Sequence, residues 1–222
     1  MKTFNLLILT VLILLSDSIN SQTIEIGTKI GTTASSIDDS DFFNDKPSIG
    51  KKLWSINHGI NTIFYFKNPR DSRTSAIVLE FNNRKLGVKS KSHNSFYEID
   101  SKSVEVVYRM CSDPDKVGRL FLDVGLGINF LSENNIYFGN TEPTLAFEKL
   151  SQPLLIKDKD YKLVLGIGYD FFLSKNLVSF LHLDACGGFT NINKNNGNYI
   201  NTYFSLNTGL RYAINFNKKR SN

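Results

Sequence analysis

The sequence predicts an all-β fold, an eight-stranded antiparallel up-and-down transmembrane β-barrel, on three observations. Several segments alternate between apolar and polar residues, the connections between them alternate between long and short, and no segment after the N-terminal run approaches the length of a membrane helix. The mean hydropathy is slightly negative, which fits because a barrel strand needs only every second residue to be apolar. With 222 residues the chain is expected to form one domain.

The clearest strand covers residues 203–216, where the even positions are apolar and the odd positions are mostly polar or small. Successive residues of a strand point to opposite faces, so one face of this strand is apolar. The same alternation recurs in residues 119–131 and 161–173. A buried helix would instead repeat its apolar residues every three or four positions. These three segments are therefore predicted strands.

Weaker alternation predicts five more strands, which brings the total to eight. They cover residues 23–33, 53–66, 74–81 with an extension to 88, 96–110 and 177–189.

The connections sort by length into two alternating groups. The first, third, fifth and seventh are long (34–52, 82–95, 132–160 and 191–198), and the others are short (67–73, 111–118 and 174–176). Outer-membrane barrels have short periplasmic turns, longer extracellular loops and both termini in the periplasm. The pattern predicts a protein of the cell outer membrane of a Gram-negative bacterium, with both termini periplasmic. Its expected partners are outer-membrane lipids and, during insertion, the barrel-assembly machinery.

The N-terminus has the three-part layout of a secretory signal peptide. Met1 and Lys2 precede an apolar run from Phe4 to Leu15, and the small and polar stretch SDSINSQ follows. The run is about a dozen residues, whereas a membrane helix needs roughly 20. We expect residues 1–21 to be a signal peptide and residues 22–222 to form the barrel domain.

The less apolar face of the strands carries charged side chains. In an eight-stranded barrel the interior is just wide enough for side chains to fill, and an ionised group buried alone is very costly. We therefore expect a paired network that plugs the lumen, with Gly125, Gly127, Gly166 and Gly168 making room for long side chains. The predicted members of the network are Glu25, Lys29, Glu105, Arg109, Arg119, Asp123, Lys162, Asp170, His182, Asp184 and Arg211.

Aromatic residues lie toward the strand ends, as expected of rings at the lipid headgroup level. The alternative is that they are core aromatics of a soluble sandwich. They are Trp54, Phe64, Phe66, Phe130, Phe171, Phe204, Tyr212 and Phe216.

The net charge is +5, and an exported protein has no access to nucleic acid. The excess of positive charge fits two interpretations, attraction of the protein to anionic lipid headgroups or lysines scattered over its surface. Cys111 and Cys186 are the two cysteines, which are too few for a disulfide framework. Whether they pair is left open by the sequence.

Two stretches resemble a known family. Residues 101–135, SKSVEVVYRMCSDPDKVGRLFLDVGLGINFLSENN, resemble the central strand, short turn and glycine-rich strand of the outer-membrane β-barrel domain family that includes the PorT-like proteins. The segment NTGLRYAINF resembles the C-terminal strand signal read by the barrel-assembly machinery, although NKKRSN follows Phe216. The resemblance implies an eight-stranded barrel and carries over no catalytic residue.

Candidate chemistry is sparse. His182 and Asp184 share a strand face, and Ser179 is nearby in sequence, a set that suggests hydrolysis of lipids. By parity Ser179 points to the opposite face, so a lumen ion pair is the preferred interpretation.

Four aspartates of the first long connection, Asp38, Asp39, Asp41 and Asp45, suggest a calcium site. The segment lacks the glycine and the distal glutamate of a calcium-binding loop, so a solvated acidic loop is preferred. His58 and His93 are isolated, and the sequence predicts no metal or cofactor site. Residues 143–150 are expected to form one or two helical turns that begin at Pro143.

Three functions remain as hypotheses. The first is a non-enzymatic integral outer-membrane barrel with a structural, surface-interaction or envelope-assembly role. The second is a secreted soluble barrel that binds a small apolar ligand, in which Leu122 and Leu206 face inward. The third is an outer-membrane lipid-modifying enzyme that uses His182 and Asp184.

Overall fold

The computed structural model describes residues 22–38, 51–89, 95–139, 147–150, 157–190 and 200–216. These residues form nine strands: β1 (Gln22–Asp38), β2 (Lys51–Tyr65), β3 (Thr74–Lys89), β4 (Ser95–Cys111), β5 (Gly118–Gly139), β6 (Phe147–Leu150), β7 (Lys159–Phe172), β8 (Leu177–Gly188) and β9 (Ile200–Phe216).

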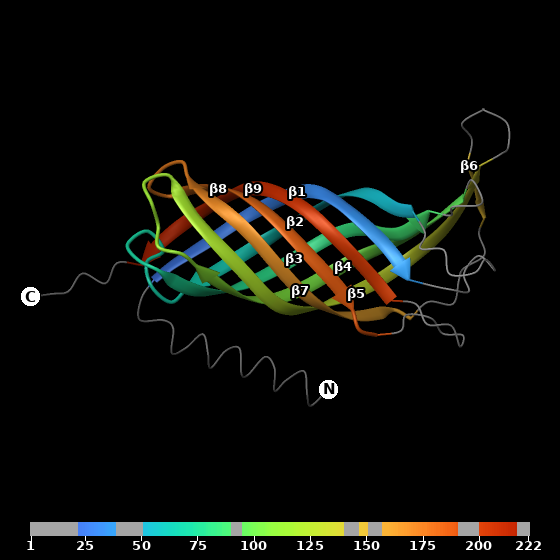
Figure 1. Cartoon of the computed structure of the whole chain (residues 1–222), viewed down its shortest axis with the longest axis horizontal. Coiled ribbons are helices and arrows are strands. Elements are labelled where there is room, and N and C mark those ends of the chain that lie inside the picture. The colour runs from blue at the N-terminus through green and yellow to red at the C-terminus, as the bar shows by residue number, and fades with distance from the viewer. Residues whose placement is uncertain are drawn as a thin grey trace, which may run out of the picture.

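Eight of these strands close into an antiparallel barrel (Figure 1). Consecutive strands pair from β1 to β5 and from β7 to β9, and β5 pairs with β7. The first and last strands pair in register from Gln22 opposite Phe216 to Asp38 opposite Ile200. Strand β6 pairs only with the far end of β5. The predicted fold class, an eight-stranded up-and-down barrel, is confirmed.

Both ends of the described barrel chain, Gln22 and Phe216, lie at the end of the barrel that carries the connections 66–73, 112–117 and 173–176 (Figure 1). We call this the turn end and the opposite one the loop end. In the described residues no helix is long and apolar enough to cross a membrane.

At the loop end the strands run farther than the sequence predicts. The sequence predicts a long connection over residues 82–95, but β3 continues to Lys89 and β4 begins at Ser95. That prediction is wrong because the ladder between β3 and β4 stays in register to Lys89 and Phe96. The expected extension of the strand to residue 88 is correct.

The segment 143–150 is also corrected where the structure describes it. Residues 147–150 form strand β6 rather than a helical turn. They pair with Ile136 to Gly139, so their backbone groups bond to the far end of β5 instead of to each other. The signal-peptide residues 1–21 lie outside the described residues.

The side chains of the barrel alternate between a polar interior and an apolar exterior. Strand β7 alternates between exposed and buried residues over most of its length. Large apolar side chains are exposed on all eight barrel strands, whereas most of the buried side chains are polar or charged. This distribution is the reverse of that in a soluble protein.

Candidate functional site

The charged interior predicted from the sequence is present. All eleven predicted charged side chains are exposed by 5% or less, and the alternation of the strands places them inside the barrel. The sequence prediction missed Glu80, Arg84 and Asp160, which are equally buried. The described interior thus holds seven carboxylates (Glu25, Glu80, Glu105, Asp123, Asp160, Asp170, Asp184), six lysine or arginine side chains (Lys29, Arg84, Arg109, Arg119, Lys162, Arg211) and His182.

Nearest the turn end, five side chains from five strands form a cluster that we call the turn-end cluster. Arg211 donates to Glu25 at 3.0 Å and also pairs with Asp170. Arg119 donates to the other oxygen of Asp170 at 3.0 Å and to the hydroxyl of Tyr65. The Tyr65 hydroxyl donates to Glu25 at 3.0 Å. Glu25 therefore has a cationic and a hydroxyl donor, and Asp170 has two cationic donors, as buried charges require.

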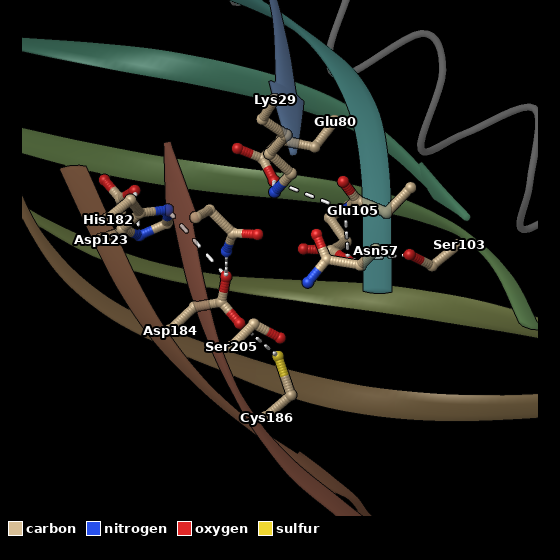
Figure 2. Close-up of polar contacts among 12 residues, drawn as sticks. Lys29, Asn57, Glu80, Ser103, Glu105, Asp123, His182, Asp184, Cys186 and Ser205 are labelled. Atoms are coloured by element: carbon tan, nitrogen blue, oxygen red, sulfur yellow. Dashed lines mark hydrogen bonds and ion pairs between the residues drawn. The ribbon is translucent and has the colours of Figure 1, made fainter. Parts of the chain in front are cut away.

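In the middle of the barrel an ion pair lies against the rings of Phe121 and His182. Nε and Nη2 of Arg109 donate to the two oxygens of Asp123 at 2.9 and 2.7 Å. The Arg109 guanidinium lies 3.7 Å from the ring centroid of Phe121, a cation–π contact. His182 lies beside this pair, with its Nε2 3.4 Å from Asp123 and its Nδ1 4.0 Å from Asp184. Figure 2 shows His182 between the two carboxylates.

Nearer the loop end, Glu105 is the centre of a second cluster, which we call the Glu105 cluster (Figure 2). One oxygen of Glu105 lies 2.8 Å from a guanidinium nitrogen of Arg84 and 2.6 Å from the ammonium of Lys162. The same oxygen accepts hydrogen bonds from Asn82 and Ser103, each at 2.8 Å. Lys29 pairs separately with Glu80. At the loop-end rim, Asn129 and Asn201 donate to Asp160 at 3.1 and 3.2 Å.

Two of the four predicted glycines make room for the charged network. A Cβ on Gly127 would lie 2.6 Å from Cε of Lys162, and one on Gly166 would lie 2.3 Å from Nε2 of His182. Gly168 leaves space for the Phe121 ring and Gly125 for Val107. Glycine is therefore the residue that lets adjacent strands carry the long charged side chains.

The candidate catalytic set of His182, Asp184 and Ser179 does not assemble. His182 and Asp184 are each 4% exposed in the lumen, and Ser179 has the strand parity of the outer face. Cys111 and Cys186 are both free and buried. Among the described residues no group of three metal-ligating side chains could hold an ion. Asp39, Asp41, Asp45 and His93 lie outside the described residues.

Comparison with known proteins identifies no family. No family model and no curated protein match the sequence, so the resemblance to PorT-like proteins stays a prediction. Solved structures do match. The outer membrane protein OprG from Pseudomonas aeruginosa is 11% identical with a TM-score of 0.49, over 86% of this chain and 95% of that chain.

Two further solved structures are similar to the same degree. Neisserial surface protein A is 11% identical with a TM-score of 0.47, over 84% of this chain and 96% of that chain. The attachment invasion locus protein Ail of Yersinia pestis, solved with the heparin analogue sucrose octasulfate, is 14% identical with a TM-score of 0.43, over 86% of this chain and 99% of that chain.

Proposed function

We propose that this chain is an integral outer-membrane barrel with a plugged lumen and a non-enzymatic role, oriented with its turn end and both termini in the periplasm. The barrel body anchors the loop-end extension, which is the far end of β5 up to Gly139 together with β6. The observation that carries the proposal is the inverted distribution of side chains, apolar toward the surroundings and charged toward the interior. Water would solvate such an exterior poorly, whereas a bilayer solvates it well.

The height of the apolar exterior matches a bilayer. On β5 the outward side chains are apolar from Leu120 to Phe130, both of which are more than 40% exposed. Ten steps of about 3.3 Å, tilted by roughly 40°, span about 25 Å. The apolar band of outer-membrane barrels is also about 25 Å tall.

Aromatic side chains border this apolar band. Phe130, Tyr161 and Phe204 lie toward the loop end, whereas Phe171 and Tyr212 lie toward the turn end, and each is at least 39% exposed. Rings of this kind are favoured at the headgroup level of a bilayer. Their exposure argues against core aromatics of a soluble sandwich.

The soluble ligand-binding barrel is not supported. That hypothesis requires Leu122 and Leu206 to face inward, but their side chains are 45% and 50% exposed on the outer face. The interior instead holds the ion pairs described above. These charged side chains offer no apolar surface on which a small apolar ligand could bind.

The enzyme hypothesis is also not supported. A general base has to reach a substrate, and His182 is buried between Asp123 and Asp184 inside the barrel. The proposed role is therefore structural or surface-interacting. The part suited to such contacts is the loop-end extension, where β5 continues to Gly139 and pairs with β6 beyond the apolar band (Figure 1).

The proposal is tested on the full-length protein in the membrane. We expect it to fractionate with outer membranes, to migrate faster on a gel when unboiled than when boiled, and to be cleaved within residues 132–160 by protease added to intact cells. Soluble fractionation together with unchanged migration after boiling would refute the barrel assignment. Protection of residues 132–160 on intact cells, with cleavage after lysis, would refute the proposed orientation.

A further inference from the structure

Two adjoining hollows lie on the outer wall of the barrel where the apolar band meets the loop-end extension. Their volumes are about 540 and 390 Å³. Both are lined by His58, Asn83 and Lys102, so they form one continuous surface feature across β2, β3 and β4. We call it the wall hollow.

The half of the wall hollow toward the turn end is apolar. Its outward-facing lining includes Ile60, Phe81 and Phe130, whose side chains are 54%, 50% and 41% exposed. These residues belong to the apolar band assigned above to the bilayer. A hydrocarbon chain that lies here would replace bulk lipid at little cost while its other end stays at the band edge.

The half toward the loop end is polar and carries cations. Lys102 is exposed and forms no ion pair with any residue that the structure describes. His58 lies beside it and contacts the amide of Asn83 at 3.5 Å. Among the described residues that line this half, Asp100 is the one carboxylate, and Lys85 is paired with Glu98 at 2.8 Å.

An irregularity in the wall accounts for the place of the hollow. The register between β2 and β3 shifts between Lys52 and His58, so the intervening residues of β2 have no partner on β3. The Ser55 hydroxyl donates to the backbone oxygen of Lys85 at 2.7 Å across this gap. A bulge of this kind twists the strand locally and re-aims its side chains, and Ile56 and His58 at this irregularity line the hollow.

We infer that the wall hollow binds one phosphate-bearing lipid of the outer leaflet, with an acyl chain over Ile60 and Phe81 and the phosphate at Lys102 and His58. Headgroup phosphates lie at the edge of the apolar band, where lysine and a hydrogen-bond donor can both reach them. This inference rests on the proposed membrane location and orientation, and it adds a specific lipid to them.

The test uses the full-length protein, extracted in detergent and titrated with lipid A that carries its phosphates, with binding counted by native mass spectrometry. We expect one retained lipid and about tenfold weaker binding for Lys102→Gln, because a charge-assisted hydrogen bond is lost. Lys52→Gln is the matched control. Lys52 is also an outward-facing cation at the loop end, but it lies over the Phe204 ring and does not line the hollow.

Three outcomes would overturn the inference: equal binding by the Lys102 and Lys52 variants, equal binding of lipid A stripped of its phosphates, or displacement of the lipid by an equal concentration of inorganic phosphate. Fractionation and gel migration of the same variants separate this inference from the proposed function. If the variants insert normally but the chain shows no preference for phosphate-bearing lipid A, only the inference is contradicted. If the wild-type chain does not enter membranes, the proposed function is contradicted.

Discussion

Arg109 and Asp123 are direct cross-strand partners on β4 and β5, and they form a two-bond ion pair inside the barrel. Each is 5% exposed or less. The strand register therefore places a guanidinium opposite a carboxylate, so that neither charge is buried alone.

Removing one partner of this pair is expected to destabilise the barrel strongly. Asp123→Leu leaves the Arg109 guanidinium buried without its carboxylate, at a cost of about 3 to 5 kcal/mol. The double variant Arg109→Met, Asp123→Leu should be more stable than Asp123→Leu alone, because no charge is stranded. Urea unfolding in lipid vesicles, followed by the fluorescence of Trp54, the single tryptophan, measures both. A double variant no more stable than the single one would contradict this account of the pair.

A methyl group at Gly166 is expected to disturb the middle of the barrel. The added Cβ would lie 2.3 Å from Nε2 of His182 and 3.2 Å from Cβ of Asp123, so the His182 ring must move. We expect Gly166→Ala to lower the free energy of unfolding by about 1 to 3 kcal/mol, typical of overpacking. Gly187→Ala is the control, since nothing lies within 4 Å of its added Cβ. Equal stability of the two variants would show that the lumen is loosely packed.

A charge on the outer face is expected to impair insertion according to its depth. Leu126 is 59% exposed near the middle of the apolar band, and Leu126→Arg should cost about 2 to 4 kcal/mol near the midplane. Thr202→Arg places the same side chain on an exposed outward position near the loop-end edge, where the cost falls to about 0 to 1 kcal/mol. The fraction folded into vesicles, read by gel migration without boiling, measures the difference. If both variants insert equally, the outer face does not contact hydrocarbon.

The turn between β4 and β5 is expected to lose stability in acid. Hydrogen bonds from the backbone N–H groups of Gly118 and Val117, each 2.7 Å from Asp115 Oδ1, hold the pKa of this carboxyl below its ordinary value of 3.8. The folded-state pKa is thus below the unfolded one. The stabilisation is present above pH 3.8 and is lost as the pH falls through the lower folded-state pKa.

Asp115→Asn should therefore lower the urea midpoint at pH 7 and leave a smaller difference from wild type at pH 3. Lys116→Gln removes a charge from the same exposed turn and serves as the control. A deficit of Asp115→Asn that is the same at both pH values would mean that the ionised form of Asp115 contributes nothing to the turn.

The sequence misses parts of the fold where the outward face meets water. Beyond the apolar band the outward residues Asn83 and Lys85 are polar, so alternation stops although the β3–β4 ladder continues. That is why residues 82–95 resemble a loop in sequence. Because the inward and outward residues of this segment are both polar, the sequence pattern does not identify Arg84 as an inward side chain. Nearer the turn end, inward Ala76 and Val78 and outward Ile77 are all apolar, so the pattern does not identify the inner face of β3 near Glu80 either.

The sequence by itself determined the barrel class, the strand number and the face to which each of eleven charged side chains points, because strand periodicity is a local property. Only the tertiary structure decided which charges meet. Arg211 bonds to Glu25 although 186 positions separate them, because β9 closes on β1. The partner of each charge, the bulge beside His58 and the wall hollow depend on register between strands, and no single segment of the chain encodes that register.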